Sequence, residues 1–256
     1  MKHVVMFSGG ISSWAAAKRV VERYEPSDTV LVFADTKMED EDLYRFLNEA
    51  SVNTGGELVR LKDGRTPWEV FFDKRFLGNT RVDPCSRILK RELIRSWLDQ
   101  TYQPNECIIY LGMDWTEEHR FIRAQRYWEP YQVEAPLIDP PMDKIQQLEW
   151  LASEGILPPR LYEMGFPHNN CGGFCIKAGH AQFKLLLETM PDRYAYHEAQ
   201  EQKIREFLDK DVAILRDRTG GKLRPLTMKE FRERVIADKC DTLDLFEWGG
   251  CACFTP

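Results

Sequence analysis

The sequence has no long apolar run, no charged leader followed by an apolar segment, no internal repeat and no low-complexity segment. The first two absences argue against a membrane span and a secretory signal peptide. The last two argue against repeat architectures and long disordered tracts. Positive charge is not in excess either: the net charge is −6, so the surface as a whole does not favour nucleic acid, although a local basic patch could. We therefore expect a cytoplasmic protein.

What the sequence does contain is an alternation of strand-like and helix-like segments. The chain has 256 residues, 43% of them hydrophobic, enough for a large core. Short apolar runs rich in β-branched residues predict strands at residues 3–7, 29–36, 57–63 and 107–114. Apolar residues between them recur at helical spacing, as in 14–24, 43–50 and 86–102. This alternation predicts an α/β fold with a parallel sheet and right-handed crossovers.

The character of the chain changes near residue 135. Prolines punctuate the next segment, and residues 179–211 read as two helices broken at Met190 and Pro191. A strand and turn at 212–225 and a last helix at 227–239 follow. We expect a core of residues 1–135 and an α-rich region of residues 136–256.

The segment FSGGISS joins the first strand to the first helix. Gly9 and Gly10 allow backbone N–H groups to approach an anion, and the helix start adds partial positive charge. Hydroxyls of Ser8, Ser12 and Ser13 can add hydrogen bonds. The alternative is a tight turn with a serine helix cap, and the two glycines alone do not decide between them. No lysine follows the glycines, so this is not a Walker A loop.

Charged residues follow the strands at positions suited to a ligand. Asp35 ends the second strand and could hydrogen-bond a nucleoside or bind a metal, or simply cap the next helix. Beyond the fourth strand come Asp114, Glu117 and Arg120. Arg120 either contacts phosphate while Glu117 orients it, or forms an ordinary helical ion pair.

A second group of cations lies at the start of the helix at 86–102. Arg87, Lys90 and Arg91 oppose the helix dipole there, which favours an anion-binding role over a solvated face. Together with Arg81 they could hold a polyphosphate, a sulfonucleotide or a nucleic-acid backbone. His168 and His180 flank the cysteine block and could be ligands, but we expect ordinary loop or cap histidines.

Seven cysteines without a secretory signal favour metal or redox chemistry over disulfides. Cys171 and Cys175 flank two glycines, and Cys251 and Cys253 lie near the C-terminus. Tight glycine-rich turns can direct such thiolates at a soft metal. Cys85 follows a proline at a helix start, where we expect the dipole to lower its pKa. Two interpretations of these cysteines remain possible. One is a structural zinc site of Cys171, Cys175, Cys251 and Cys253, and the other is redox chemistry at Cys251 or Cys253.

The two remaining cysteines have simpler interpretations. Cys107 falls in a buried strand pattern and Cys240 at a helix end, and both are expected to pack.

Five segments together resemble a known family. FSGGISS is similar to the SGGxDS loop of the PP-loop ATP pyrophosphatase superfamily, in its phosphoadenosine-phosphosulfate-reductase-like branch. The other matches, in order, are VFADTKMEDEDLYRFL, DPCSRILKREL, LGMDWTEEHR and PPRLYEMGFPHNNCGGFCIKAG. They cover roughly residues 3–185. The chain departs from the pattern at Ser12, where the family usually has an aspartate that could help to hold Mg²⁺; Asp35 or Glu39 could supply that charge.

The resemblance implies a fold and a set of ligands. The fold would be a five-stranded parallel sheet flanked by helices, of the adenine nucleotide alpha hydrolase (HUP) type, with an α-rich C-terminal extension bearing the cysteine pairs. ATP or an adenosine phosphosulfate would bind with Mg²⁺, and Asp35 and Thr36 would lie by the nucleoside. The nucleotide-binding set would be Ser8, Gly9, Gly10, Ser12, Ser13, Asp35, Thr36, Gly112, Arg87 and Lys90. The catalytic set would be Asp35, Asp114, Glu117 and Arg120. A [4Fe–4S] cluster would take Cys85, Cys171, Cys175 and either Cys251 or Cys253.

Three functions follow from this resemblance. The first is adenine-nucleotide-dependent sulfur transfer, with a nucleic acid or nucleotide as acceptor and a protein as sulfur donor. The second is reduction of an adenylyl sulfate to sulfite, although the tail GGCACFTP lacks the Glu-Cys-Gly motif of thioredoxin-dependent reductases. The third is a catalytically silent nucleotide-binding module with structural zinc.

Overall fold

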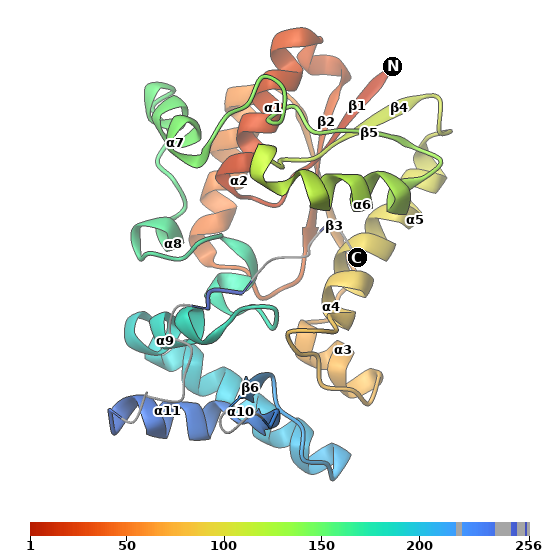
Figure 1. Ribbon diagram of the computed structural model, residues 1–256. Helices are drawn as coiled ribbons and strands as arrows, with labels where there is room; N and C mark the ends of the chain where they lie inside the picture. Colours follow the sequence, from red (N-terminus) through yellow and green to blue (C-terminus); the bar gives the residue numbers. More distant parts are fainter. Residues whose placement is uncertain (219–221, 239–246, 250–253, 255–256) are drawn as a thin grey trace.

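A computed structural model describes residues 1–218, 222–238, 247–249 and 254 (Figure 1). Its main sheet has five parallel strands in the order β3-β2-β1-β4-β5. The strands are β1 Lys2–Met6, β2 Thr29–Asp35, β3 Glu57–Lys62, β4 Cys107–Tyr110 and β5 Gln132–Glu134. The predicted α/β class with a five-stranded parallel sheet is confirmed. The apolar runs had marked four strands, whereas β5, with three residues, is too short to show a pattern.

Helices cover both faces of this sheet. The helices α1 Ile11–Arg23, α2 Glu41–Thr54 and α7 Lys144–Ser153 contribute to the core on one face, with Val5 and Leu31. The helices α5 Leu93–Thr101 and α6 Glu118–Trp128 pack on the other, with Val4 and Val32. Because both faces are covered, all seven residues of β2 are buried, which explains its unbroken apolar run.

A second hydrophobic core forms a helical lobe, seen in the lower part of Figure 1. Its helices are α3 Pro67–Asp73, α4 Pro84–Ser86, α8 Arg160–Glu163, α9 His180–Thr189, α10 Pro191–Leu208 and α11 Met228–Ile236. The predicted break at Met190 and Pro191 is present. A two-stranded hairpin, β6 Leu215–Asp217 and β7 Arg224–Leu226, completes it. Trp68 and Leu89 share this core with Leu161 and Phe231, so the lobe draws on both sides of residue 135; the division there stays a prediction.

Short irregular helices connect these parts. They are the 3₁₀ helices η1 Pro26–Asp28, η3 Trp115–Glu117 and η4 Asn170–Gly173, and the π-helical segment η2 Arg87–Glu92. The segment 86–102, predicted as one helix, is therefore the end of α4, the wide turn η2 and α5. Such π-helical turns occur often at functional sites.

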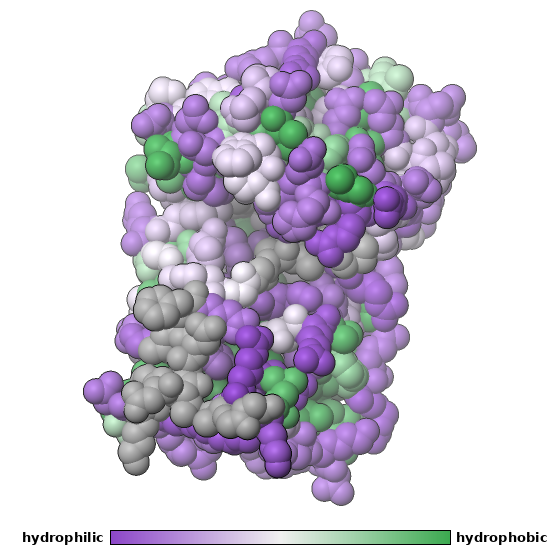
Figure 2. All heavy atoms as spheres, in the orientation of Figure 1, coloured by the Kyte–Doolittle hydropathy of each residue, from purple (hydrophilic) through white to green (hydrophobic). Residues whose placement is uncertain are grey.

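Within the described residues, no helix combines the length and apolar character that crossing a bilayer requires. The face seen in Figure 2 is mainly hydrophilic, with hydrophobic residues scattered in small groups.

Candidate functional site

The order of the strands reverses between β1 and β4, which lie side by side in the sheet. Beyond β1 the chain passes to α1 on one face, and beyond β4 it passes to α6 on the other. Ligands of open α/β sheets bind in the crevice that such a divergence creates. A cavity of about 430 Å³ opens there, which we call the switch-point cavity. Its lining includes Ser8, Gly10, Ser12 and Ser13.

In the loop FSGGISS, a glycine and not a serine is the N-cap of α1. Gly9 has φ +76°, a conformation that favours glycine, and Gly10 is the N-cap of α1 in extended conformation. Gly10 has no side chain with which to cap the helix, and Ser12 and Ser13 lie inside the first turn of α1. Ser13 Oγ donates to the Gly10 carbonyl at 2.7 Å. The first turn of α1 borders the cavity, and the Tyr162 hydroxyl, which also lines it, accepts from Ile11 N at 3.4 Å.

The loop after β4 forms the opposite wall. Gly112, Asp114, Glu117 and Arg120 all line the cavity, as the resemblance implied. A Cβ at Gly112 would lie 2.6 Å from the backbone of Ser12, so the two loops touch. Asp114 caps η3 by accepting from Thr116 N at 2.9 Å. Glu117 and Arg120 form the predicted ion pair, and the pair faces the cavity.

The residues expected near the adenosine lie elsewhere. Asp35 is buried and accepts hydrogen bonds from Lys37 N (2.8 Å) and the Tyr44 hydroxyl (2.9 Å). Lys62 Nζ lies 3.4 Å from its other oxygen. The described lining of the switch-point cavity does not include Asp35, and neither does that of a smaller pocket lined by Cys85, Cys171 and Cys175, the cysteine pocket. Thr36 lines the cysteine pocket instead.

Each of the three cations around η2 faces its own acid. Arg87 pairs with Glu92 at 2.9 Å on the surface, and the described lining of neither site includes it. Lys90 pairs with Glu39 at 3.4 Å in the interior. Arg91 pairs with Asp83 at 3.3 Å. Only Lys90 of these cations reaches a candidate site, and that site is the cysteine pocket.

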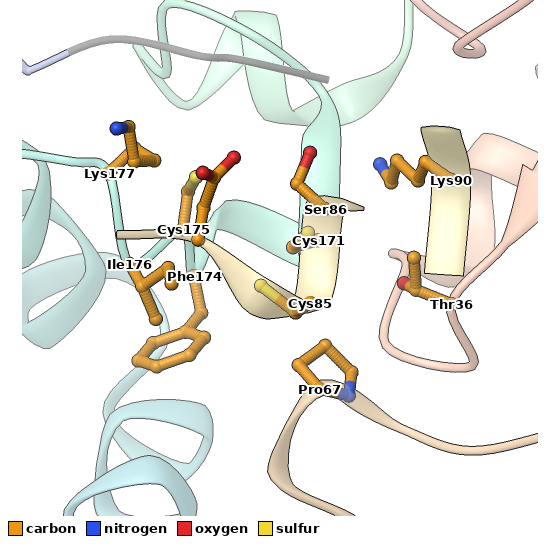
Figure 3. Close-up of a pocket in the computed structure, with 11 residues that line it drawn as sticks. Thr36, Pro67, Cys85, Ser86, Lys90, Cys171, Phe174, Cys175, Ile176 and Lys177 are labelled. Carbon is orange, nitrogen blue, oxygen red and sulfur yellow. The ribbon is translucent and has the colours of Figure 1, made fainter. Parts of the chain in front are cut away.

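Cys85, Cys171 and Cys175 line the cysteine pocket, which has a volume of about 30 Å³. Figure 3 shows the side chains of the three cysteines around this pocket, Cys85 from α4 and the other two from the turn at 171–175. Cys171 and Gly172 lie in the left-handed region (φ 52° and 59°), which folds that turn back on itself. Gly172 also lets the Arg193 guanidinium come close, because a Cβ at this position would collide with Arg193 Nη1. Arg193 donates to the Gly172 carbonyl at 2.8 Å.

The electrostatics of Cys85 differ from the prediction. We expected the helix start to lower its pKa; instead burial raises the pKa of the Cys85 thiol well above its ordinary value. The neighbouring Cys175 and Asp83 add to that rise, and Lys90 opposes it only partly. Desolvation outweighs the dipole of a three-residue helix. A cationic metal centre would provide the charge that such thiols need to ionise.

The cysteine pocket offers three thiols, which are ligands for a soft metal centre. Within residues 1–218, 222–238, 247–249 and 254, no three His, Cys, Asp or Glu side chains are placed to hold one metal ion. The thiolates of a [4Fe–4S] cluster bind different irons, so they need not meet at one point. Cys251, Cys253 and Cys240 lie outside the described residues, so the fourth cluster ligand and the zinc alternative stay predictions. Cys107 is buried on β4, where burial raises its pKa to about 11.

The two sites are neighbours. Asn169 lines the switch-point cavity and donates through Nδ2 to the Gly9 carbonyl at 3.1 Å. Two residues later, Cys171 N donates to Glu39 Oε2 at 2.5 Å, and the Thr36 hydroxyl donates to Glu39 Oε1 at 3.0 Å. The glycine loop and the cysteine turn are thereby linked through buried polar contacts.

The cavity is also lined by residues that the sequence did not predict to belong to the site. Lys144, Tyr162, His168 and Asn169 all line the switch-point cavity. Of the two histidines expected to be ordinary, His180 begins α9 with its Nε2 3.0 Å from the Arg216 carbonyl, whereas His168 faces the cavity. The sequence signal for Lys144 is local: the capping box of Asp143 and Gln146 marks the helix start that carries it.

Comparisons with known proteins found similar solved structures but no match by sequence. No family model matches the chain, and none of the curated proteins matches it in sequence. Among solved structures, the chain is similar to phosphoadenylyl-sulfate (PAPS) reductase from Candida auris in a phosphate complex. That match has 14% sequence identity and a TM-score of 0.46, and it covers 65% of this chain and 79% of the reductase chain.

Proposed function

We propose that this protein is an adenine-nucleotide-dependent sulfur-transfer enzyme. The observation that supports this most is the adjacency of two sites: an anion-binding loop at the strand switch point and a pocket lined by three cysteines. The contact of Asn169 with Gly9 holds the cysteine turn against the glycine loop. A nucleotide's phosphates and a sulfur-handling centre would then lie within one connected region.

Different residues have different roles in this proposed reaction. The start of α1 and the loop 8–13 bind the phosphates, and backbone N–H groups stabilise charge that develops on departing pyrophosphate. Arg120, oriented by Glu117, neutralises a phosphoryl oxygen. We assign Asp35 to holding the loop after β2, because its oxygens already accept from Lys37 and Tyr44. A [4Fe–4S] cluster on Cys85, Cys171 and Cys175 would supply sulfur-transfer or electron-transfer chemistry.

The decisive experiment follows the nucleotide and the metal together. After anaerobic purification, iron and acid-labile sulfide are measured, and pyrophosphate release from ATP and sulfite release from adenosine phosphosulfate are assayed. Pyrophosphate release with matching iron and sulfide supports sulfur transfer, whereas sulfite release with a thiol donor supports a reductase. Stoichiometric zinc without either release supports the silent module.

One observation favours that silent module as a second candidate. Ser12 Oγ accepts from Lys144 Nζ at 2.7 Å, so a cation lies where the related loops offer a carboxylate. A loop of this kind could bind a nucleotide without cleaving it. Binding of ATP with no pyrophosphate release would select this function.

The charge of the cavity predicts a pH-dependent affinity. Burial, with Lys90, Arg120 and Lys144, lowers the pKa of His168 to about 4. An anionic ligand beside these cations offsets their effect and raises that pKa, so the complex binds more protons than the free protein. Affinity should therefore rise as pH falls from 7 toward 5 and level off below about 4.

Calorimetry at pH 5.5 in two buffers of different ionisation enthalpy measures this proton uptake. The difference in proton uptake between the wild type and His168→Gln gives the contribution of His168, because the ligand's own titration is the same in both. Equal proton uptake by the two proteins would contradict the prediction.

A further inference from the structure

Lys144 reaches the glycine loop from 132 residues away along the chain. Its helix, α7, begins at a capping box in which Asp143 Oδ1 accepts from Gln146 N at 2.9 Å. The helix packs on α1 through an edge contact of Trp14 and Trp150, with ring centroids 5.2 Å apart. This packing brings the first turn of α7 over the first turn of α1.

Ser12 is held at that junction by two residues of α7. Lys144 Nζ donates to Ser12 Oγ at 2.7 Å, and Ser12 Oγ donates to Gln147 Oε1 at 2.8 Å. Both residues lie on one face of α7, three positions apart. The hydroxyl of Ser12 is thus fixed as an acceptor for the ammonium group rather than pointing freely into solvent.

The ammonium group lacks a close counterion within the described residues. No carboxylate among them lies within 4.0 Å of Lys144 Nζ, although Asp114 and Glu117 act on it from farther away. Burial lowers the pKa of Lys144, because a desolvated cation is disfavoured. The side chain lines the switch-point cavity, where an anion would restore the missing charge balance.

The carboxylates nearest this loop already have partners through at least one oxygen each. Glu39 accepts from Thr36 and Cys171 N and pairs with Lys90, and Asp35 pairs with Lys62. The acids in the described cavity lining are Asp114 and Glu117. Asp114 caps η3, and Glu117 pairs with Arg120. At Ser12 itself the described side-chain partners are Lys144 and Gln147, so this point of the loop fits an anion and offers no carboxylate to a divalent cation.

We propose that Lys144 is the phosphate-binding cation of this loop, and that it holds the ligand's polyphosphate without a divalent metal ion. This inference rests on the proposed nucleotide-binding function and adds to it the way in which the phosphates are neutralised. An aspartate at position 12 would pair with Lys144 and cancel its charge. Serine leaves that charge available to phosphate.

The test is calorimetric titration of the full chain with pyrophosphate and with ATP, in EDTA and in excess Mg²⁺. The wild type should bind in EDTA about as tightly as in Mg²⁺. Lys144→Met should weaken binding in EDTA about tenfold to 100-fold, the value of one charge-assisted hydrogen bond. Ser12→Asp should lose affinity in EDTA and regain it with Mg²⁺, because a metal can then bridge the new carboxylate and the phosphate.

Lys184→Met is the matched control, since Lys184 pairs with Glu188 in the helical lobe; it should bind like the wild type. Thermal unfolding of each variant confirms that it is folded. Wild-type binding that requires Mg²⁺ and is unchanged in Lys144→Met would overturn this proposal alone. Absence of wild-type binding in both conditions would overturn the proposed function and this proposal with it.

Discussion

Replacing Glu39 with glutamine is expected to lower the free energy of unfolding by about 3 kcal/mol, the cost of leaving one charge of a buried pair uncompensated. The Glu39 side chain is only 1% exposed, and it pairs with Lys90, itself 5% exposed, at 3.4 Å. Its carboxylate also accepts from Cys171 N and from the Thr36 hydroxyl. Glutamine keeps the shape but loses the charge and one acceptor.

Urea denaturation measures this loss, and Glu49→Gln is the matched control. Glu49 pairs with Arg45 one helical turn away and its side chain is 44% exposed, so its loss should cost under about 0.5 kcal/mol. Equal midpoints for the two variants would show that the Glu39 contacts add nothing beyond a surface pair. Cysteine-bound iron, if present, should fall in Glu39→Gln, because Glu39 fixes the backbone of Cys171.

The second large effect is expected for Gly112→Ala. The added methyl carbon would lie 2.6 Å from the Ser12 carbonyl group and 2.7 Å from Ser13 N, both backbone atoms that cannot rotate away. The loop after β4 and the start of α1 must therefore separate. Misplacement of positioning residues by about 1 Å can cost about 100-fold in reaction rate, and we expect a loss of nucleotide affinity of about the same size.

Gly155→Ala separates this effect from general destabilisation. Gly155 has φ +72° and no atom within 4 Å of a built Cβ, so alanine there adds backbone strain of about 1 kcal/mol without a clash. It should lower stability yet leave nucleotide binding unchanged in calorimetry. Wild-type affinity in Gly112→Ala would mean that the contact of the two loops does not shape the site.

The sequence alone determined the features that depend on near neighbours. The apolar run at residues 29–36 marks a central strand, and Pro191 marks the break between α9 and α10, because each pattern acts within a few residues. The glycine loop at 8–13 and the gathering of Cys85 with Cys171 and Cys175 were also anticipated, the latter through the family resemblance. The strand β5 was not, because three residues carry too little pattern.

Only the tertiary structure decided how the ionisable side chains of the two sites are buried and paired. The sequence favoured a lowered pKa for Cys85, but burial beside Cys175 raises it. Asp35 looked available for a ligand, yet Tyr44 and Lys62 engage it across β2, α2 and β3. Lys144 reaches Ser12 only because α7 packs on α1. Desolvation and ion pairing depend on which distant segments meet, and no local pattern carries that information.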